Sequence, residues 1–435
     1  MFAMDVEYEE VVSSILAIPR YKKKANLETV SYLLRLLHHP LAHVKVIHVA
    51  GTNGKGSVCA YLDSIGKAQG YSMGLFTSPH LLTIRERMRV GGEMISESDF
   101  VLCYKKVRQA EEQMLADGGV PATFFEVIFC MAAVYFAEKH VDYAIVEAGI
   151  GGRSDTTNIV HPVLSIITSV GLDHVAILGD TISQIAYEKA GVLKTSVPAV
   201  IGLVPEEAKE VIRRYGEEID ASCQFIEEYG LRILKNRPEG IDFSLDCGYD
   251  KEGFFHTGLM GAFQAFNAAV AILAAKRLFD IPYSVLFGAI ADTVWEGRME
   301  EVAPRFYVDG AHNEEAMHAF ADTVLTCFGD KPKVVLYAVA NDKDDVSMLR
   351  ELLLSGVHTI IVTELLNERR TDVQQVGALI RQEARLLGID KIEIKEMAEL
   401  SKALDYVRAI QNTKDYVFCV GSLYLVAAVK EVFND

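Results

Sequence analysis

Hydrophobic and polar positions divide the chain into an opening helical segment and two stretches in which strands and helices alternate. The opening segment spaces apolar side chains three and four residues apart, as at Val11, Val12, Ile15 and Leu16, which predicts helices. Short runs rich in β-branched residues then alternate with helical stretches, at 44–49, 71–76, 143–147, 164–168 and 197–201. This alternation predicts a mostly parallel sheet covered by helices on both faces.

A second alternation begins near residue 305, after an Ala-rich segment, 261–279, that predicts a buried helix. Its expected strands are 305–308, 334–338, 359–362, 391–394 and 416–420. We place the boundary between the two alternations within 297–304. The pattern therefore predicts an α/β protein with an N-terminal domain, 1–297, and a smaller Rossmann-like α/β domain, 298–435.

The composition is that of a folded protein. Half of the 435 residues are hydrophobic, which is enough for two cores and excludes disorder as the main state. The 60 acidic residues outnumber the 43 basic ones and give a net charge of −17. Because this field repels phosphate backbones and anionic lipids, we expect no nucleic acid and no membrane partner. An anionic small substrate then requires a local basic pocket or a metal ion.

The cysteines and the apolar segments bear on the compartment. Seven cysteines are scattered along the chain without a C-x-x-C pair, so we expect neither a zinc site nor a disulfide framework. The acidic N-terminus lacks the layout of a signal peptide. The longest apolar stretch, 416–429, is shorter than the ~20 residues that span a bilayer. We expect a cytoplasmic protein, and a monomer.

A glycine-rich loop follows the first predicted strand and opens a helix: Gly51-Thr52-Asn53-Gly54-Lys55-Gly56-Ser57. Small residues let backbone N–H groups turn towards phosphate oxygens, and the helix N-terminus adds partial positive charge. Lys55 supplies a cation for the outer phosphates, and a hydroxyl can reach Mg²⁺. The loop departs from G-x-x-x-x-G-K-[ST] in two ways. Gly51 lies three residues before Gly54 rather than five, and Gly56 displaces the hydroxyl of Ser57 by one place. A plain turn is the alternative, but the strand-loop-helix context with a lysine favours a P-loop ATPase-like domain.

Three polar residues lie at or after the carboxyl ends of other predicted strands of the first sheet: Ser78, Glu147 and His174. The carboxyl ends of parallel strands meet at one crevice, where ligands bind. Hard oxygen donors suit Mg²⁺, which bridges substrate phosphates. Each residue also has a structural alternative, namely a Ser-Pro turn, a salt bridge at a strand end and a hydrogen-bonded loop residue.

With the phosphate loop, a series of ordered motifs resembles the folylpolyglutamate synthases and dihydrofolate synthases of the Mur ligase superfamily. The motifs lie at 78–81, 147–158, 171–174, 188–191, 261–268, 295–300, 309–313 and 421–424. The resemblance implies an ATP-dependent ligase that adds L-glutamate to dihydropteroate and to reduced folates through an acyl phosphate. It assigns ATP binding to 1–297 and the glutamate ligase role to 298–435.

The resemblance also implies individual roles. Lys55, Lys189 and His174 are the catalytic residues, and two Mg²⁺ ions are held, one by Ser78 and Glu147 and one by His174. Lys189 corresponds to the lysine that this superfamily carbamylates, which turns a cation into an anion. Without the resemblance, the Glu188-Lys189 pair reads as solvated surface.

The remaining implied contacts are to nucleotide and substrates. Asn267, Arg298, Asp309 and His312 match residues that contact ATP, and Ser422 faces the incoming glutamate. On the residues alone, Asn267 is a buried asparagine of a helix and Asp309-Gly310 is a turn that ends a strand.

The pterin end of the substrate is assigned to Thr123, Phe125, Asp155 and Thr156. An aromatic side chain in this region would stack on a flat ring. The alternative for Thr123 is a helix cap followed by two core phenylalanines. Thr156 replaces the alanine of the family's D-A-T-N motif, which bears on whether dihydropteroate is accepted.

The leading hypothesis is therefore a bifunctional dihydrofolate and folylpolyglutamate synthase. The nearest alternative is an enzyme that only extends folates with glutamate. A distant alternative is a P-loop switch or kinase, which the sequence disfavours because Asn-Asp-Lys-Asp at 341–344 lacks the context of a guanine-reading motif. A non-catalytic binding protein would not require Ser78, Glu147 and His174 together.

Overall fold

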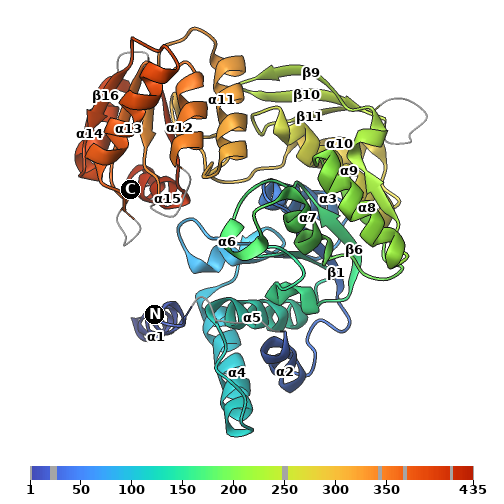
Figure 1. Ribbon diagram of the computed structural model, residues 1–435. Coiled ribbons are helices and arrows are strands. Elements are labelled where there is room, and N and C mark those ends of the chain that lie inside the picture. The colour runs from blue at the N-terminus through green and yellow to red at the C-terminus, as the bar shows by residue number, and fades with distance from the viewer. Residues whose placement is uncertain are drawn as a thin grey trace. The chain divides into compact units, whose positions relative to one another are not determined.

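The computed structural model describes residues 2–19, 27–246, 253–340, 345–365, 370–411 and 415–434 (Figure 1). The chain forms two compact units. Unit 1 comprises Met1–Arg232, Ser244–Phe255 and Phe266–Thr293, and unit 2 comprises Ile233–Phe243, His256–Ala265 and Val294–Asp435. The segment 341–344, which entered the switch hypothesis, lies outside the described residues.

The main sheet of unit 1 has eight strands in the order β4-β3-β2-β5-β1-β6-β7-β8. Their bounds are β1 (Lys45–Ala50), β2 (Met73–Phe76), β3 (Met88–Val90), β4 (Glu93–Met94), β5 (Tyr143–Glu147), β6 (Pro162–Ile167), β7 (Ala199–Ile201) and β8 (Cys223–Phe225). The strands from β2 to β8 across the sheet are parallel, and β3 and β4 extend it as antiparallel strands. All five strands predicted for this half of the chain are confirmed, and the mostly parallel sheet with them.

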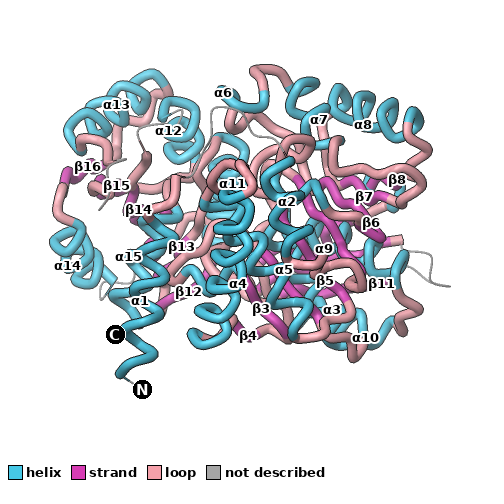
Figure 2. The backbone as a smooth tube through the Cα atoms, turned by 90° about the horizontal axis from the view of Figure 1, so that it is seen from below, coloured by secondary structure: helices cyan, strands magenta, loops and turns pink. Residues whose placement is uncertain are grey.

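Helices cover both faces of this sheet, as predicted (Figure 2). On one face, residues of α1, α2, α4 and α5 form one buried apolar cluster with Val46, Phe76, Ala144 and Val146 of the sheet. On the other face, α7 and α8 pack against Ile167 and Ile201. The helices that begin within the first 300 residues are α1 (Phe2–Leu16), α2 (Glu28–Leu36), α3 (Lys55–Ala68), α4 (Glu97–Ala116), α5 (Phe124–Glu138), α6 (Val175–Leu178), α7 (Ile182–Ala190), α8 (Glu206–Glu218), α9 (Phe263–Leu278) and α10 (Tyr283–Ala291).

The helix α9 confirms the prediction of a buried helix at 261–279. Its residues from Gln264 to Ala275 are buried apart from Phe266. Alanine and larger apolar residues occupy nearly every position of this stretch, so the helix is apolar on all sides and suits a location between other elements.

A second, three-stranded sheet has the order β11-β10-β9. It is formed by β9 (Arg232–Arg237), β10 (Gly240–Leu245) and β11 (Gly253–Thr257). The sequence pattern did not predict it. The first four side chains of β9 are exposed, so that strand shows no alternation of apolar and polar residues.

Unit 2 contains a six-stranded sheet in the order β12-β13-β17-β14-β15-β16. Its strands are β12 (Glu300–Ala303), β13 (Phe306–Val308), β14 (Lys333–Tyr337), β15 (Thr359–Val362), β16 (Glu393–Glu396) and β17 (Tyr416–Val420). The five strands from β13 to β16 are parallel, whereas β12 pairs antiparallel with β13. These five are the predicted ones, and β12 lies within the segment expected at the boundary.

The helices of unit 2 are α11 (Glu314–Phe328), α12 (Asp345–Leu354), α13 (Val373–Leu386), α14 (Leu400–Gln411) and α15 (Leu423–Asn434). The chain passes from β13 through α11 to β14, and β17 then returns between these two strands. Such a reversal of strand order leaves a crevice at the carboxyl ends of the strands. The Rossmann-like α/β prediction for this half is confirmed.

Two further observations concern the described residues only. The cysteines among them, which are Cys59, Cys103, Cys130, Cys223, Cys327 and Cys419, are all free thiols. Within the same part of the chain, the helices are too short or too polar for any of them to cross a membrane.

Candidate active site

The carboxyl ends of β1, β2, β5 and β6 converge at one edge of the main sheet. Val49 of β1 lies opposite Glu147 of β5, and Ala50 lies opposite Ile167 of β6. Phe76 of β2 lies opposite Val146 of β5. The segments that leave these strands therefore begin side by side, which is the placement that the sequence predicted for the site.

The phosphate loop connects β1 to α3, and its glycines meet two constraints. Gly54 precedes α3 with a φ of 81°, a left-handed conformation that favours glycine. Gly51 lies so close to the side chain of Thr168 that a Cβ atom would collide with its hydroxyl. The loop therefore requires glycine at these two positions for backbone reasons, in agreement with a loop that turns its amides around an anion.

The segment after β6 braces the phosphate loop. Thr52 Oγ1 donates to the carbonyl of Gly171 at 3.1 Å, and the backbone N–H of Asn53 donates to Ser169 Oγ at 2.9 Å. Thr168 Oγ1 donates to the carbonyl of Asn53 at 2.6 Å. Ser169 is not among the predicted site residues, and its only sequence signal is its place directly after the strand.

Lys55 and Asn267 lie against this loop. Lys55 Nζ donates to the carbonyls of Gly51 at 3.0 Å and Thr52 at 3.1 Å, so its ammonium group is held at the mouth of the loop. The side-chain amide of Asn267, from α9, occupies the space that a Cβ atom of Gly54 would take. Gly54 and Asn267, which the sequence assigned separately to nucleotide binding, are thus brought together. Ser57 lies in the first turn of α3 and is buried.

The two predicted metal ligands Ser78 and Glu147 are in direct contact. The backbone N–H of Ser78 donates to Glu147 Oε2 at 2.9 Å. Glu147 is 4% exposed at the end of β5. Burial, and after it the charge of Glu147, raises the pKa of the Cys59 thiol far above its usual range. The carboxylate therefore influences a residue in the first turns of α3 electrostatically.

His174 lies in the segment that follows β6. It precedes α6 in a left-handed conformation, with a φ of 51°, and it is exposed. No three His, Cys, Asp or Glu side chains within the described residues are arranged to hold a metal ion. The geometry therefore supports Ser78 and Glu147 as a pair and leaves the metal role of His174 a prediction.

Lys189 is buried, at 2% exposed, in the last turn of α7. The loop that follows Glu147 packs on this turn: the backbone N–H of Arg153 donates to the carbonyl of Glu188 at 2.7 Å. A Cβ atom on Gly152 would lie 2.9 Å from the carbonyl oxygen of Lys189. The interpretation of Lys189 as solvated surface is therefore wrong, and its burial agrees with the role that the resemblance implies.

The residues assigned to the pterin end lie around Gly149. Phe125 Cζ lies 2.8 Å, and Asp155 Oδ2 3.2 Å, from the place of a Cβ atom on that glycine. Thr123 caps α5: its N–H and hydroxyl donate to Glu126 Oε2 at 2.6 and 2.8 Å. The helix-cap alternative is correct for Thr123, while Phe125 remains half-buried beside Asp155. Thr156 begins the short 3₁₀ helix η2 (Thr156–Ile159), directly after Asp155.

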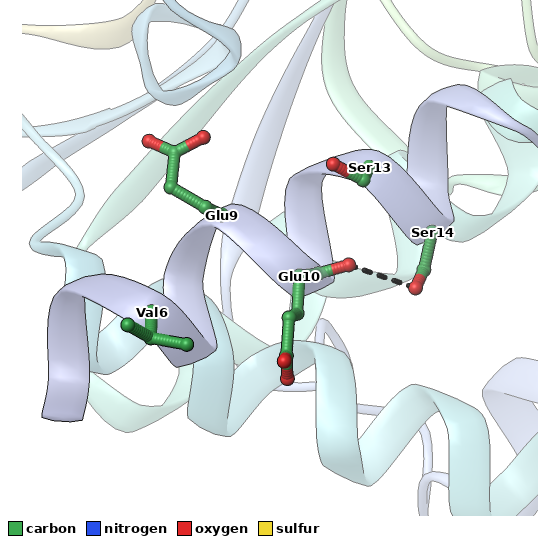
Figure 3. A pocket seen from close by; sticks show the side chains of 5 residues that line it. All are labelled: Val6, Glu9, Glu10, Ser13 and Ser14. Atoms are coloured by element: carbon green, nitrogen blue, oxygen red, sulfur yellow. Dashed lines mark hydrogen bonds between the residues drawn. The ribbon is translucent and has the colours of Figure 1, made fainter.

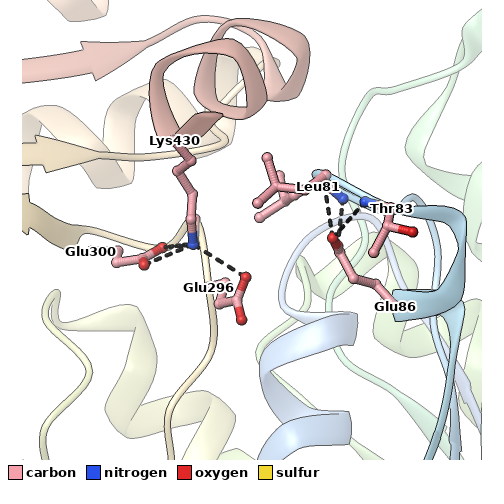
Figure 4. Close-up of polar contacts among 8 residues, drawn as sticks. Leu81, Thr83, Glu86, Glu296, Glu300 and Lys430 are labelled. Atoms are coloured by element: carbon pink, nitrogen blue, oxygen red, sulfur yellow. Dashed lines mark hydrogen bonds and ion pairs between the residues drawn. The ribbon is translucent and has the colours of Figure 1, made fainter. Parts of the chain in front are cut away.

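One buried carboxylate near Ser78 escaped the sequence analysis. Glu86 accepts hydrogen bonds from three successive backbone N–H groups, those of Leu81 at 2.7 Å and of Leu82 and Thr83 at 2.8 Å (Figure 4). The chain that follows Ser78 is therefore held in a fixed course. A capping-box pattern, Thr83-x-x-Glu86, was the signal that could have revealed it.

In unit 2 the assigned residues meet where β13 and β17 end. Asp309 accepts from the backbone N–H groups of Met299 at 2.9 Å and Ala311 at 2.8 Å. Burial raises the pKa of Asp309, and the nearby charge of Arg298 opposes that rise. The guanidinium of Arg298 covers Gly310, which leaves no room for a Cβ atom there.

His312 and Ser422 complete this group. His312 Nδ1 lies 2.7 Å from the carbonyl oxygen of Gly310. Ser422 is buried, and its hydroxyl accepts from the N–H of Tyr424 at 3.2 Å. The backbone N–H of Gly421 donates to the carbonyl of Ala311 at 3.1 Å, so the two strand ends that carry the assigned residues are joined.

A buried lysine supports the segment that carries Arg298. Lys430 Nζ, on α15, lies 3.1 Å from Glu296 Oε2 and 2.8 Å from Glu300 Oε1 (Figure 4). Glu300 also accepts from the backbone N–H of Gly297 at 2.6 Å. These bonds fix the chain on both sides of Arg298.

The family follows from the sequence patterns that match these two halves. The Mur ligase middle domain matches residues 49–275, and the glutamate ligase domain of Mur ligases matches residues 297–423. The chain belongs to the Mur ligase family. It is an ATP-dependent glutamate ligase of that family, as the sequence motifs indicated.

Similar proteins indicate to which group within the Mur ligase family this chain belongs. A dihydrofolate synthase/folylpolyglutamate synthase of Bacillus subtilis is 36% identical over 439 residues, which cover 98% of this chain and 99% of that protein. The structure of Mycobacterium tuberculosis folylpolyglutamate synthase complexed with ADP has a TM-score of 0.90 at 27% identity, over 99% of both chains. E. coli FolC in complex with DHPP and ADP has a TM-score of 0.85 at 28% identity, over 98% of this chain and 97% of that one. The Mur ligase described here thus groups with the folylpolyglutamate and dihydrofolate synthases.

A hollow elsewhere on this Mur ligase has no counterpart among the assigned residues. Five side chains of α1 line it: Val6, Glu9, Glu10, Ser13 and Ser14 (Figure 3). Ser14 Oγ donates to the backbone carbonyl of Glu10 at 2.8 Å, so this hydroxyl is used within the helix. A single helix face with two carboxylates offers nothing that would hold a nucleotide phosphate.

Proposed function

We propose that this Mur ligase is a bifunctional dihydrofolate and folylpolyglutamate synthase that adds L-glutamate to dihydropteroate and to reduced folates. The similarity to the Bacillus subtilis protein, which extends over 98% of this chain, supports both activities. In this proposal residues 1–297 form the ATP-binding domain and residues 298–435 form the glutamate ligase domain.

The observation that carries the proposal is the juxtaposition of the phosphate loop with the Ser78–Glu147 pair at one sheet edge. Backbone amides of residues 51–57 bind the phosphates of ATP, and Lys55, which lies on the carbonyls of Gly51 and Thr52, would move its ammonium group onto the outer phosphate. Asn267, in contact with Gly54, binds the nucleotide from the side of α9. Beyond the loop, the nucleotide contacts are assigned to Arg298, Asp309 and His312.

The donor set at the strand ends fits Mg²⁺. Glu147 presents a buried carboxylate, Ser78 carries a hydroxyl beside it, and such hard oxygen ligands are those that this ion prefers. Ser78 and Glu147 would hold one ion and His174 a second. When bound, Mg²⁺ neutralises charge on the transferring phosphoryl group and orients it.

Lys189 is proposed to carry a carbamate. Its burial disfavours an ammonium group and favours the neutral amine that reacts with CO₂. The carbamate would be an anion within the layer that packs on the loop after Glu147.

The proposed reaction has two steps, and different residues of the chain act in each. The substrate carboxylate attacks the γ-phosphate of ATP, and Lys55 and the amides of the phosphate loop stabilise the charge that moves to the leaving ADP. The amine of L-glutamate, beside Ser422, then attacks the acyl phosphate carbonyl, and phosphate leaves. Phe125 stacks on the pterin ring, with Thr123, Asp155 and Thr156 at its edge.

The test is phosphate release from ATP in the presence of L-glutamate, with dihydropteroate and tetrahydrofolate offered in parallel. Release with both substrates, dependent on glutamate and Mg²⁺, is expected. Release with tetrahydrofolate alone would leave the alternative of a folylpolyglutamate synthase only. Phosphate release without either pterin substrate would favour the P-loop switch or kinase. The expectations of a monomer and of a cytoplasmic location stay predictions.

A further inference from the structure

His48 is a buried histidine of β1 that has no assigned role. It lies three residues before Gly51 on the sheet face that packs on α2 and α5, as its neighbour two residues before, Val46, does. Its Nε2 lies 2.8 Å from Thr157 Oγ1, and its Nδ1 is buried without a hydrogen-bond partner. Burial, and after it the charge of Lys194, lowers the pKa of His48 to about 3, so the imidazole is neutral.

Thr157 connects this histidine to Asp155. The backbone N–H of Thr157 donates to Asp155 Oδ1 at 2.9 Å, and its hydroxyl donates to the same oxygen. The N–H of Ile150 donates to Asp155 Oδ2 at 2.9 Å. Burial raises the pKa of Asp155, and these donors oppose the rise because they stabilise the carboxylate.

The direction of the chain of hydrogen bonds follows from the chemistry of each group. An ionised carboxylate only accepts, so the single proton of the Thr157 hydroxyl is directed to Asp155. The oxygen of that hydroxyl must then accept from His48, which requires the proton of the neutral imidazole on Nε2. The unpartnered Nδ1 agrees with this tautomer, because a lone pair is left there rather than an N–H group.

The end of this chain lies in the cluster that we assign to the pterin. Asp155 Oδ2 and Phe125 both adjoin Gly149. Gly149 and Phe125 are half-buried and Asp155 keeps 6% exposure, whereas Thr157 and His48 are 0% exposed. His48 therefore cannot touch a substrate in that cluster, but it sets the orientation of a carboxylate that can.

We propose that His48 is a positioning residue for Asp155: by donating to Thr157 it directs the threonine hydroxyl to Oδ1 and fixes Oδ2 for an N–H donor of the pterin. This inference rests on the proposed function for its substrate, though not for the hydrogen-bond chain itself. Because β1 leads directly into the phosphate loop, the same strand orients groups on both substrates.

Paired substitutions test the role. His48→Gln can place a side-chain N–H near the position of Nε2, whereas His48→Leu cannot. We expect His48→Leu to raise the KM for dihydropteroate roughly tenfold, the effect of one lost hydrogen bond, with the KM for ATP unchanged. His48→Gln should recover most of that loss. Thr157→Val should match His48→Leu, and the double variant should be no worse than either.

A control separates positioning from stability. Ser165 lies opposite His48 on β6, is equally buried, and donates through Oγ to the carbonyl of Val192 at 2.8 Å. Ser165→Ala should lower the melting temperature without changing the KM for dihydropteroate. Equal KM values for His48→Leu and the parent, or equal KM increases in Ser165→Ala and His48→Leu, would overturn the proposal.

A spectroscopic measurement needs no substrate. In the parent with ¹⁵N-labelled histidine, the His48 signal, identified by its loss in His48→Gln, should show a protonated Nε2 and an unprotonated Nδ1 at neutral pH. An Nδ1–H tautomer or an imidazolium would contradict the hydrogen-bond chain. Failure of the parent to use any pterin substrate would instead contradict the proposed function, and the tautomer would still be measurable.

Discussion

The backbone N–H of Ser78 donates a hydrogen bond to Glu147 Oε2 at 2.9 Å, joining the ends of two neighbouring parallel strands. The bond uses one lone pair of the carboxylate and leaves the others directed elsewhere. It also orients the chain that carries the Ser78 hydroxyl. Carboxylate and hydroxyl oxygens are ligands that a hard cation prefers, so this pair supports the proposed Mg²⁺ site.

Glu147→Gln should raise the Mg²⁺ concentration needed for half-maximal turnover by roughly tenfold or more, the least expected for loss of a direct ligand. Glutamine keeps an oxygen that can accept from Ser78, so the substitution removes the charge while the loop is retained. The measurement is the initial rate as a function of Mg²⁺ at saturating ATP. An unchanged Mg²⁺ requirement would mean that Glu147 only holds the loop.

The same titration examines His174. His174→Gly removes the imidazole and suits the left-handed backbone found there, while His174→Ala adds strain at this position. If His174 contributes to a second ion, both variants should raise the Mg²⁺ requirement to the same degree. A change in His174→Ala alone would point to strain, and the histidine would then be structural.

Lys55→Ala should lower kcat by roughly 10² or more, by analogy with the loss of one preorganised donor to a developing charge. In the structure the ammonium group is held by the carbonyls of Gly51 and Thr52, which places it at the loop. Lys67→Ala is the matched control, because Lys67 lies in the last turn of the same helix and pairs with Asp63 at 2.8 Å. Turnover near that of the parent in Lys55→Ala would contradict the assignment of the phosphate loop.

Buried strands were the most predictable part of the fold. The strands β1, β5 and β14 have buried apolar residues along nearly their whole length, and such runs stand out against helical spacing. The strand β9 contains Arg232, Lys235 and Arg237 and exposes most of its side chains. Its pairing with β10 comes from tertiary context, which a local pattern does not carry.

The site residues at the ends of strands were predictable from the sequence. Those whose position depends on tertiary packing and burial were not. Ser78 and Glu147 could be paired because strands β2 and β5 end together. The contact of Asn267 with Gly54 joins segments far apart in the sequence, and only the resemblance gave Asn267 a role in nucleotide binding. Lys189 reads as surface because lysine and its neighbour Glu188 are charged, and its burial depends on the packing of the loop that contains Gly152.

Thr156→Ala restores the residue that the family usually has after Asp155, and it should raise kcat/KM for dihydropteroate relative to tetrahydrofolate. Removing a hydroxyl and a methyl group from a pocket wall changes such a ratio by roughly tenfold. Competition between the two substrates in one reaction measures the ratio directly. Thr156→Ser, which keeps the hydroxyl, is the control, and an unchanged ratio in both variants would place Thr156 outside the specificity pocket.

Lys430→Met should lower the free energy of unfolding by about 2 kcal/mol, since it leaves the partly buried carboxylates of Glu300 and Glu296 without their cation. The reference is Lys402→Met, which breaks a pair with Glu399 whose two side chains are 68% and 63% exposed and should cost less than about 0.5 kcal/mol. Urea unfolding of both variants decides the matter. Equal losses would mean that burial of Lys430 adds nothing to its ion pairs.

The buried position of Lys189 raises the question whether its side chain carries an ammonium group or a carbamate. Burial at 2% exposure disfavours an ammonium group, whereas a carbamate supplies an anion that attracts Mg²⁺. We expect the intact parent protein, kept in bicarbonate and analysed without acid, to be heavier by one CO₂ than its sequence mass. The Lys189→Arg variant should show its sequence mass alone. Acidification should remove this mass, because carbamates release CO₂ when protonated.

Substitutions then separate the anion from the side chain. Lys189→Ala should be nearly inactive and folded, and a small carboxylic acid such as acetate should partly restore turnover by occupying the vacated anion site. Lys189→Arg should not be rescued, because its positive charge is fixed. Lys194, a half-buried lysine that donates to Asn158 Oδ1 at 2.7 Å, provides the control: Lys194→Ala should gain nothing from acetate. Near-full activity of Lys189→Arg would rule out a required carbamate, and the charge of the metal site would then have to be balanced by the carboxylate of Glu147 and the phosphates of ATP.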